Sequence, residues 1–390
     1  MRVESLYEYM HNQLSSAKLD FRRYQYDRIN WENRMLALVG PRGVGKTTLF
    51  LQRIHDAHAD GGALYLSADH LYFMTHTLLE VADAFYKQGG IYLFIDEVHK
   101  YPGWSRELKN IYDAYPELHV YFTGSSVLDI EGGDADLSRR APRYVMQGLS
   151  FREFLKIRHG IDAPLLSLEQ ILANEVSIPG VKHPLPLFSE YLERGYYPFG
   201  SDLDFDTELR QVITRSLEHD IPAYAGMTVA TGRKLLKLMV VVSELVPFKP
   251  NMSDLGKRIQ ASRNNVEDYL TYMEKAGMIA QLRTGASGLG ALSKAEKLYL
   301  DNTNILHNLC EACDAGTVRE TFFFNQMRVN HLVTSSAISD FQIDGRTFEV
   351  GGPSKGQSQI KDADEGYIVR DGIEYGHGNV IPLWAFGLNY

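Results

Sequence analysis

The sequence predicts an α/β protein that begins with a parallel sheet and continues into smaller domains, and three observations support this prediction. A glycine-rich loop, Gly40 to Thr47, lies between an apolar segment at 34–39 and a segment with helical periodicity. A second apolar segment ends in two adjacent acids, Asp96 and Glu97. Further along the chain, helical segments give way to short strands. Apolar strands that alternate with helices are typical of a parallel sheet buried on both faces.

The glycine-rich loop reads GPRGVGKT and fits the pattern G-x-x-x-x-G-K-[ST]. A strand, a glycine loop and a helix start together form an anion site, because backbone N–H groups and the helix dipole face the negative charge. Lys46 is expected to reach the β- and γ-phosphates of a nucleotide, and the Thr47 hydroxyl to bind Mg²⁺. The predicted nucleotide-binding residues are Gly40, Pro41, Arg42, Gly43, Val44, Gly45, Lys46, Thr47 and Thr48.

The acid pair follows the run Ile91 to Ile95, which suits a strand buried on both faces. Ligands of open α/β sheets bind at the carboxyl ends of the strands. Asp96 is therefore predicted to hold Mg²⁺, and Glu97 to orient and polarise the attacking water. The alternative interpretation is an acidic helix start, where Asp and Glu are also favoured.

A third strand, predicted at 118–122, leads into Thr123-Gly124-Ser125-Ser126. A polar side chain at the tip of this strand would lie between the loop and the acid pair. There it would contact the γ-phosphate or the water, and Thr123 and Ser125 are both candidates. An ordinary Gly-Ser turn is the alternative.

Several motifs, taken in order, resemble those of prokaryotic AAA-superfamily ATPases with a P-loop and a C-terminal domain of unknown function of the DUF4143 type. Besides the loop and the acid pair, they are LYLSAD at 64–69, FTGSS at 122–126, LSRR at 137–140, LSFREF at 149–154, YLERGYYP at 191–198 and RETFFFNQ at 319–326. The resemblance implies ATP and Mg²⁺ as ligands, with Lys46 and Thr47 at the phosphate and Mg²⁺ positions and Asp96 and Glu97 as the acidic pair.

The resemblance also implies a homo-oligomer. Arg139 and Arg140 lie where related ATPases carry an arginine that reaches the nucleotide of a neighbouring subunit. The alternative is that these arginines pair with the local acids Asp134 and Asp136. Many relatives have two arginines where this loop reads Arg42-Gly43, so the resemblance assigns Arg42 no role.

Composition agrees with a cytoplasmic protein of several domains. The chain has 390 residues, 44% hydrophobic and 23% charged, with two cysteines. No apolar run reaches the ~18 residues of a membrane span, and the first residues lack the apolar stretch of a signal peptide. Two cysteines do not make a disulfide framework; Cys310 and Cys313 are predicted as buried helix residues. The expected domains are a P-loop ATPase core at 1–149, a helical lid at 150–227, a winged helix at 228–301 and a small α/β domain at 302–390.

The lid and the winged helix are predicted from helix caps and turns. Ser150 with Glu153 three positions later forms a capping-box pattern. The winged helix is expected to comprise helices at 232–245, 253–259 (capped by Ser253) and 263–275, followed by a hairpin with strands at 278–282 and 297–300.

The winged helix raises the question of DNA binding. Residues 228–284 carry nine Lys or Arg against five Asp or Glu. Phosphate contacts would come from Lys257, Arg258 and Arg263, and base contacts from Asn264 and Asn265. Such a module also serves as plain packing between domains, and that interpretation stays open.

The last domain resembles a degenerate PD-(D/E)xK nuclease fold. Glu320, Asp340 and Glu349 follow the order of its metal-binding acids, but Gly351 stands where its lysine belongs. Lys355 and Lys361 follow and are candidates to replace that lysine. The region 285–390 has thirteen acidic against eight basic residues, a poor surface for DNA, so nuclease activity is not expected.

The sequence therefore predicts a Mg²⁺-dependent ATPase whose nucleotide state controls the winged helix and the last domain, and which acts on an unknown protein client. Two alternatives remain: a slow nucleotide-gated switch, and an ATP-licensed protein that binds or cleaves DNA. Each predicts a different turnover rate and a different response to added DNA.

Overall fold

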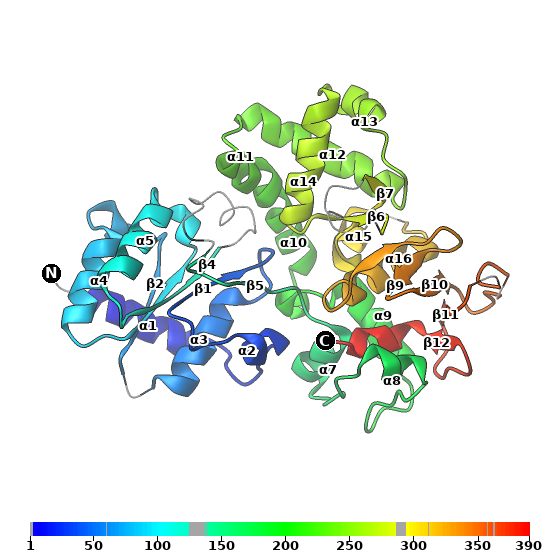
Figure 1. The fold of residues 1–390 in the computed structure, drawn as a ribbon, viewed down its shortest axis with the longest axis horizontal. Helices are drawn as coiled ribbons and strands as arrows, with labels where there is room; N and C mark the ends of the chain where they lie inside the picture. Colours follow the sequence, from blue (N-terminus) through cyan, green and yellow to red (C-terminus); the bar gives the residue numbers. More distant parts are fainter. Residues whose placement is uncertain are drawn as a thin grey trace. The chain divides into compact units, whose positions relative to one another are not determined.

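A computed structural model of the chain describes residues 3–59, 61–124, 137, 139–285, 294–310, 312–356, 358–361 and 363–390. The chain divides into two compact units, Met1–Gln147 and Gly148–Tyr390 (Figure 1). The first unit ends close to the boundary that the sequence predicts at 149. The division of the rest into three domains stays a prediction.

The first unit is built on a five-stranded sheet in the order β2-β3-β4-β1-β5, and every pair of neighbouring strands is parallel (Figure 1). The parallel α/β class predicted from the sequence is confirmed for this unit. The strands are β1 (Met35–Val39), β2 (Ala63–Ser67), β3 (Tyr92–Asp96), β4 (His119–Thr123) and β5 (Arg143–Val145). The helices are α1 (Glu4–Ser16), α2 (Tyr24–Arg28), α3 (Lys46–Ala57), η1 (Leu71–Met74), α4 (Leu78–Lys87), η2 (Val98–Lys100) and α5 (Trp104–Ala114).

The apolar strands are buried on both faces. Alternate residues of β1 to β4 join α1, α4 and α5 in one hydrophobic cluster. The intervening residues face the other way, and there Phe94 of β3 packs edge-on against Phe50 of α3, with ring centroids 5.3 Å apart. Burial on both faces is the physical reason for the continuous apolar runs in the sequence.

The second unit starts with helices and ends with a sheet. Its helical part comprises α7 (Phe151–His159), α8 (Leu168–Leu172), α9 (Leu185–Arg194), η4 (Pro198–Ser201), α10 (Phe205–Arg215), η5 (Ser216–Asp220) and α11 (Ile221–Tyr224). The predicted capping box at Ser150 is confirmed, because Ser150 accepts a bond from the Glu153 N–H and the Glu153 side chain accepts one from the Ser150 N–H.

Three helices and a hairpin follow, at the positions where the sequence predicts them. They are α12 (Val229–Leu245), α13 (Met252–Ile259), α14 (Arg263–Lys275), β6 (Ile279–Arg283) and β7 (Ala295–Leu300), with the two strands antiparallel. The predicted cap of α13 is wrong by two residues: the Asn251 side chain, not Ser253, accepts bonds from the first N–H groups. Both residue types are good helix caps, and the backbone enters the helix one residue earlier than predicted.

The last sheet has the order β12-β11-β10-β9-β8. Strands β8 to β10 are antiparallel neighbours, and β10 to β12 are parallel. The elements of this part are α15 (Thr303–Leu309), α16 (Ala315–Met327), β8 (Val333–Ser335), β9 (Phe341–Ile343), β10 (Arg346–Gly351), β11 (Gly366–Arg370), β12 (Val380–Pro382) and η7 (Leu383–Leu388). Cys310 caps the end of α15 in an extended conformation, and both cysteines are only half-buried, so their prediction as buried helix residues is wrong.

One hydrophobic cluster joins the helices predicted as a lid to the last sheet. Phe151 and Phe154 of α7 and Tyr191 of α9 belong to the same cluster as Phe322 of α16 and Phe348 of β10. The two segments therefore share a core, although about 120 residues separate them in the chain. No helix among the described residues has both the length and the apolar character needed to cross a membrane.

Candidate active site

The glycine-rich loop joins β1 to α3, and its glycines are required by its shape. A Cβ atom at position 40 would lie only 2.1 Å from the carbonyl oxygen of Met146, the residue after β5. Only glycine therefore fits at this position. Gly43 and Gly45 have positive φ values of 82° and 97°, a conformation that disfavours other residues. Helix α3 starts without a side-chain cap and without an acid in its first turn. A helix start of this kind favours a bound anion.

Lys46 is held inside this loop. It is buried, and its Nζ donates hydrogen bonds to the carbonyl oxygens of Gly40 and Pro41, both at 2.9 Å. The ammonium group is thus fixed by carbonyl oxygens of the loop, next to the start of α3. Lys46 is predicted from the sequence to contact the β- and γ-phosphates, and this contact stays a prediction.

Asp96, at the end of β3, is surrounded by hydroxyl groups. Its Oδ2 accepts hydrogen bonds from Thr47 Oγ1 at 2.6 Å and from Tyr65 OH at 2.9 Å, and its Oδ1 accepts one from Thr123. The residue is almost fully buried. Among the described residues no Lys or Arg forms an ion pair with it. Asp96 is therefore oriented by neutral donors, as the ligands of a metal ion typically are.

Glu97 follows in a left-handed backbone conformation, with φ 52°. This turn separates its side chain from that of Asp96 and is a strained conformation for a residue with a Cβ. Its Oε2 is buried, accepts no hydrogen bond from any described residue and lies 3.3 Å from His99 Nε2. Burial raises the pKa of Glu97, and although Lys46 opposes this effect, the pKa stays above its usual value.

Thr123 contacts both acids. It donates to Asp96 and accepts a hydrogen bond from the Glu97 N–H at 3.1 Å, and its side chain is fully buried. The predicted position at the tip of β4, beside the acid pair, agrees with this contact. In this structure Thr123 orients the two acids. Ser125, the other candidate, lies outside the described residues.

Two residues of the site carry no motif that sequence reasoning recognised. Arg23, just before α2, donates to the Val44 carbonyl oxygen at 2.5 Å and to the Gln147 carbonyl oxygen at 2.7 Å, and so supports the loop from below. Tyr65 of β2 reaches Asp96 with its hydroxyl group. A basic residue in FRRYQYDR and a tyrosine in an apolar strand are both common, so neither gave a usable signal in the sequence.

The two arginines expected to act on a neighbouring subunit differ in their surroundings. Arg140 lies 3.3 Å from Asp113 and faces the ring of Tyr112, so it is engaged within its own unit. Arg139 is exposed to solvent. The alternative partners Asp134 and Asp136 lie outside the described residues.

Residues 32–155 match the family model described as "AAA domain". The first unit contains an AAA domain. Residues 185–315 match a model described as "Domain of unknown function (DUF8612)". The resemblance to proteins with a DUF4143-type domain is therefore not confirmed, because a different domain of unknown function matches this region.

The solved structures similar to this chain are distant. They include Cdc6p from Pyrobaculum aerophilum (12% identity, TM-score 0.32, 80% of this chain and 97% of that chain) and the S. cerevisiae Hsp104-ADP complex (18%, 0.29, 70% and 38%). C. elegans PCH-2 is a third (17%, 0.25, 68% and 68%). This chain thus spans 38% of the Hsp104 chain, and none of the three scores carries an argument about overall structure. No curated protein sequence matches this chain significantly.

The acids predicted as a degenerate nuclease site are paired with lysines in the second unit. Lys297 of β7 lies 3.1 Å from Glu320 and 3.3 Å from Asp340, and Tyr299 OH donates to Glu320 at 2.6 Å. Burial opposes the charge of Lys297, but the two carboxylates outweigh it and raise the pKa of the lysine. In the described part of the chain, no three His, Cys, Asp or Glu side chains converge as metal ligands.

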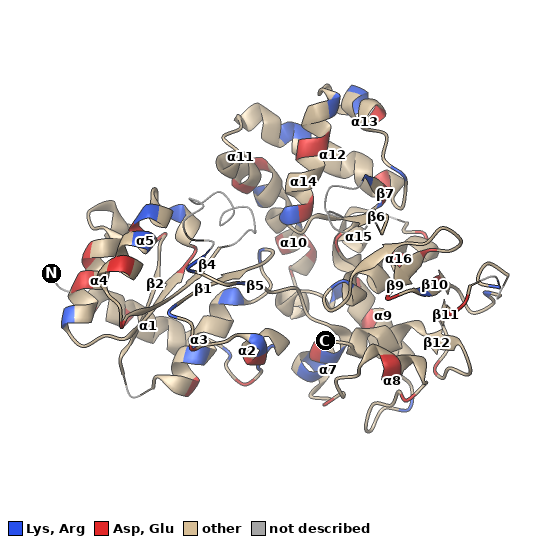
Figure 2. Cartoon of the chain, viewed as in Figure 1, with Lys and Arg blue, Asp and Glu red and all other residues tan. Residues whose placement is uncertain are grey.

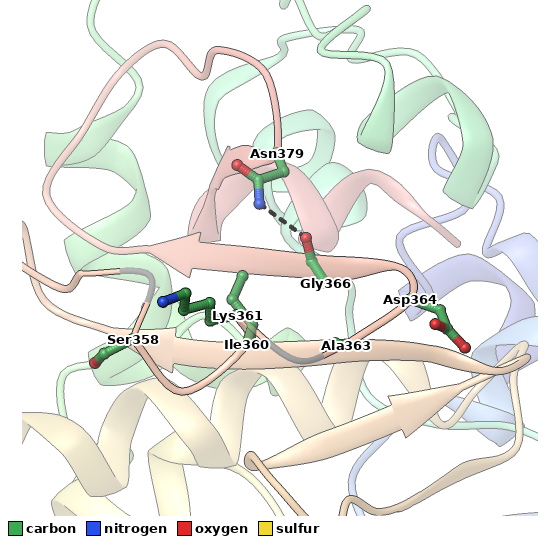
Figure 3. A pocket seen from close by; sticks show the side chains of 7 residues that line it. All are labelled: Ser358, Ile360, Lys361, Ala363, Asp364, Gly366 and Asn379. Carbon is green, nitrogen blue, oxygen red and sulfur yellow. Dashed lines mark hydrogen bonds between the residues drawn. The ribbon is translucent and has the colours of Figure 1, made fainter.

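The third acid of that set, Glu349, forms an ion pair with Lys355. A Cβ atom at position 351 would lie 2.5 Å from a methylene carbon of the Lys355 side chain. Glycine at the position expected for lysine therefore leaves room for the Lys355 side chain beside the strand. Lys361, the other candidate, instead lines a surface pocket with Ser358, Ile360, Ala363, Asp364, Gly366 and Asn379 (Figure 3). Lys355, and not Lys361, is therefore the cation beside Glu349.

The residues predicted to contact DNA are all exposed, on α13 and the start of α14. Acidic residues lie among them: Arg263 is 3.3 Å from Glu267, and Lys257 is 4.0 Å from Asp254. Both blue (basic) and red (acidic) positions accordingly lie along the ribbon from α12 to α14 in Figure 2. Of the basic residues proposed for phosphate contact, Arg258 is the one with no ion pair among the described residues.

Proposed function

We propose that this protein is a Mg²⁺-dependent ATPase whose nucleotide state controls the arrangement of its second unit. The observation that supports this most strongly is the contrast within the acid pair. Asp96 is held by neutral hydroxyl groups, while Glu97 presents a buried oxygen that accepts no hydrogen bond from the described residues. One carboxylate is thus suited to a metal ion and its neighbour to a water molecule.

The residues around Asp96 fit Mg²⁺. This ion prefers hard oxygen ligands and keeps several waters, so a carboxylate and a hydroxyl group are typical protein ligands. Thr47 and Asp96 supply these two groups, and their 2.6 Å hydrogen bond fixes them side by side. Mg²⁺ would neutralise charge on the β- and γ-phosphates, which the N–H groups of α3 and Lys46 bind from the other side.

Glu97 is proposed as the group that orients and activates the attacking water. Its raised pKa makes it a stronger base than a solvent-exposed glutamate. The buried Oε2 is where such a water would donate its hydrogen bond. His99, 3.3 Å from the same oxygen, limits the movement of the side chain.

Steady-state turnover of Mg·ATP tests this proposal. Wild-type protein should hydrolyse ATP, and Lys46→Ala should lose both nucleotide affinity and turnover. Glu97→Gln should retain ATP binding while losing turnover by about 100-fold or more, the usual contribution of a general base. Glu117→Gln, which changes an exposed acid of the same unit, is the matched control. Equal turnover by Glu97→Gln and Glu117→Gln would contradict the assignment.

The ATP turnover rate and the ATP affinity, measured together, separate a working ATPase from a slow switch. Phosphoryl-transfer enzymes that do work turn over at roughly 1 to 100 per second, whereas an unassisted nucleotide switch runs nearer about one per hour. Tight ATP binding with turnover in the slower range would favour the switch. Protein that co-purifies with Glu97→Gln in ATP would identify the client.

Assembly into a homo-oligomer is proposed on the exposure of Arg139. If Arg139 reaches the nucleotide of a neighbour, turnover per chain should rise with protein concentration, and Arg139→Ala should remove that rise. Arg140→Ala serves as the comparison, because Arg140 is engaged with Asp113. A turnover per chain that stays constant with concentration would argue against action in trans.

DNA binding through α12 to β7, as a winged helix, is the second candidate. The exposure of Arg258, Asn264 and Asn265 favours it, because these side chains lie at the end of one helix and the start of the next. Binding measured at several salt concentrations should weaken as salt rises, and Arg258→Ala should reduce the slope by about one. Absence of binding at low salt would leave packing as the role of this segment.

A further inference from the structure

We propose that Tyr65 is a positioning residue for the metal-binding Asp96, and that its hydroxyl group sets the affinity of the site for Mg²⁺. This inference rests on the proposed ATPase function and adds a residue to it. No motif in the sequence singles out Tyr65, which lies in the middle of β2 and about 30 residues before Asp96.

The argument begins with how the Asp96 carboxylate is held. Its Oδ1 is bonded by Thr123, and its Oδ2 by Thr47 and Tyr65. Thr47 is itself a proposed metal ligand, so its hydroxyl must serve the metal and Asp96 together. Tyr65 is the one partner of Oδ2 among these residues that has no other duty at the site. It therefore fixes the plane of the carboxylate independently of the metal.

The packing around Tyr65 leaves its hydroxyl little freedom. The side chain is 1% exposed, and its ring lies parallel to that of Tyr9 of α1, with centroids 6.0 Å apart. The Tyr65 N–H contacts Met10 Sδ at 3.3 Å, also from α1. A ring clamped in this way cannot turn its hydroxyl toward solvent. The buried O–H finds its hydrogen-bond acceptor in Asp96.

The register of the sheet explains why Tyr65 reaches that far. Strands β2 and β3 are parallel, with Ser67 opposite Asp96 and Tyr65 opposite Phe94. A residue two positions before Ser67 needs a long side chain to reach the end of β3, and the phenol ring provides that length. A shorter hydroxyl residue such as Ser or Thr at position 65 would not reach Asp96.

A neutral donor also suits a metal ligand better than a cation. An ammonium group at this place would neutralise Asp96, whereas a hydroxyl group orients it and leaves its charge to the metal. Partners of this kind typically change metal affinity or activity by about 10- to 100-fold when they are removed. Loss of the Tyr65 hydroxyl is therefore expected to weaken Mg²⁺ binding by about 10-fold, at the lower end because Thr47 and Thr123 still hold Asp96.

The test is Tyr65→Phe, which removes the hydroxyl and keeps the ring. Its matched control is Tyr121→Phe, which removes a buried hydroxyl from β4 of the same sheet that bonds the Trp31 carbonyl oxygen and does not touch Asp96. The Mg²⁺ concentration for half-maximal ATP turnover should rise about 10-fold in Tyr65→Phe and stay at the wild-type value in Tyr121→Phe. Turnover at saturating Mg²⁺, and ATP affinity measured in EDTA, should change little in either variant.

Thermal unfolding of both variants separates positioning from simple stability. A lower unfolding temperature with an unchanged Mg²⁺ midpoint in Tyr65→Phe would overturn the inference, since Tyr65 would then be only a core residue. A ten-fold shift of the midpoint confined to Tyr65→Phe would support it. If wild-type protein binds Mg·ATP without turnover, the proposed ATPase function fails, and the Mg²⁺ dependence of ATP binding in the two variants still decides the role of Tyr65.

Discussion

Each unit of this protein contains a group of carboxylates that are buried or half-buried, and the two groups have different partners. In the AAA domain, Asp96 is bonded by hydroxyl groups, and Glu97 presents an oxygen without a donor among the described residues. In the second unit, Glu320 and Asp340 share Lys297, and Glu349 is paired with Lys355. Similar acids thus have hydroxyl partners in one unit and lysine partners in the other.

The comparison indicates that the groups bonded to a carboxylate, more than the carboxylate itself, decide what it can do. A hydroxyl donor orients a carboxylate without removing its charge, so a divalent cation still gains from binding it. A lysine placed between two carboxylates satisfies them, and a cation would first have to displace it. We infer that the first group serves chemistry and the second serves packing between the hairpin and the last sheet.

The largest difference is expected between two Asp→Asn variants, one in each group of carboxylates. Asp96→Asn should lower Mg²⁺-dependent ATP turnover by about 100-fold or more, because it removes the proposed metal ligand itself and not merely its support. Asp340→Asn should leave turnover at the wild-type value. Steady-state kinetics over a range of Mg²⁺ concentrations measures both. A comparable loss in the two variants would remove the distinction between the groups.

The next effect concerns stability in the second unit. Lys297→Met should lower the free energy of unfolding by about 2 kcal/mol, somewhat less than the 3 to 5 kcal/mol of a fully buried pair, because the lysine is partly exposed. Lys249→Met, which breaks the exposed pair with Glu296, should cost less than about 1 kcal/mol.

Urea unfolding monitored by fluorescence measures this difference, with ATP turnover as a second readout. Turnover should be unchanged in both lysine variants. Equal stability of Lys297→Met and the wild type would mean that Glu320 and Asp340 do not depend on the lysine, and their assignment to packing would be wrong.

A smaller effect is expected from Arg23, which lies outside the phosphate loop and bonds it. It donates to the backbone carbonyl oxygens of Val44 and Gln147, so its loss should loosen the loop while leaving the residues of the acid pair unchanged. Arg23→Gln should weaken ATP affinity by about 10-fold, equal to one or two hydrogen bonds from a charged donor. Isothermal titration with ATP measures it. Arg22→Gln, beside it and paired with Asp56 at the surface, is the control.

No effect at all is expected from the second group on DNA. Wild-type protein incubated with plasmid, ATP and Mg²⁺ or Mn²⁺ should produce no nicks, and Glu349→Ala should behave identically, because lysines already satisfy these acids. Gel electrophoresis of the plasmid gives the readout. Nicking by the wild type that disappears in Glu349→Ala would show that the second group is a working nuclease site, in favour of the ATP-licensed alternative.

Local patterns of sequence predicted the parts of the site that lie close together in the chain. The strand, loop and helix around Lys46 form one continuous segment, and Asp96 and Glu97 end a strand whose apolar character is evident from its letters. Helix α14 begins and ends where the sequence predicts, because Ser262 is a local cap. The cap of α13 was misplaced, since Asn251 and Ser253 are both good caps and only the backbone distinguishes them.

Contacts between distant residues escaped prediction. Tyr65 and Arg23 act through partners 31 and 21 residues away, and Lys297 meets Glu320 and Asp340 from a different element. The shared core of α7, α9 and the last sheet was missed for the same reason. Tyr65, Arg23, Lys297 and the apolar residues of this core are of common types. Their roles depend on which residues the fold brings beside them.

The amino-acid sequence by itself determined the parallel sheet, the phosphate loop and the acid pair of the AAA domain, because hydrophobic periodicity and loop conformation are local properties of the chain. Only the tertiary structure decided which carboxylates lack a lysine partner. That outcome depends on whether a hydroxyl group or an ammonium group comes within about 3 Å of each oxygen, and such distances arise when separate elements pack together.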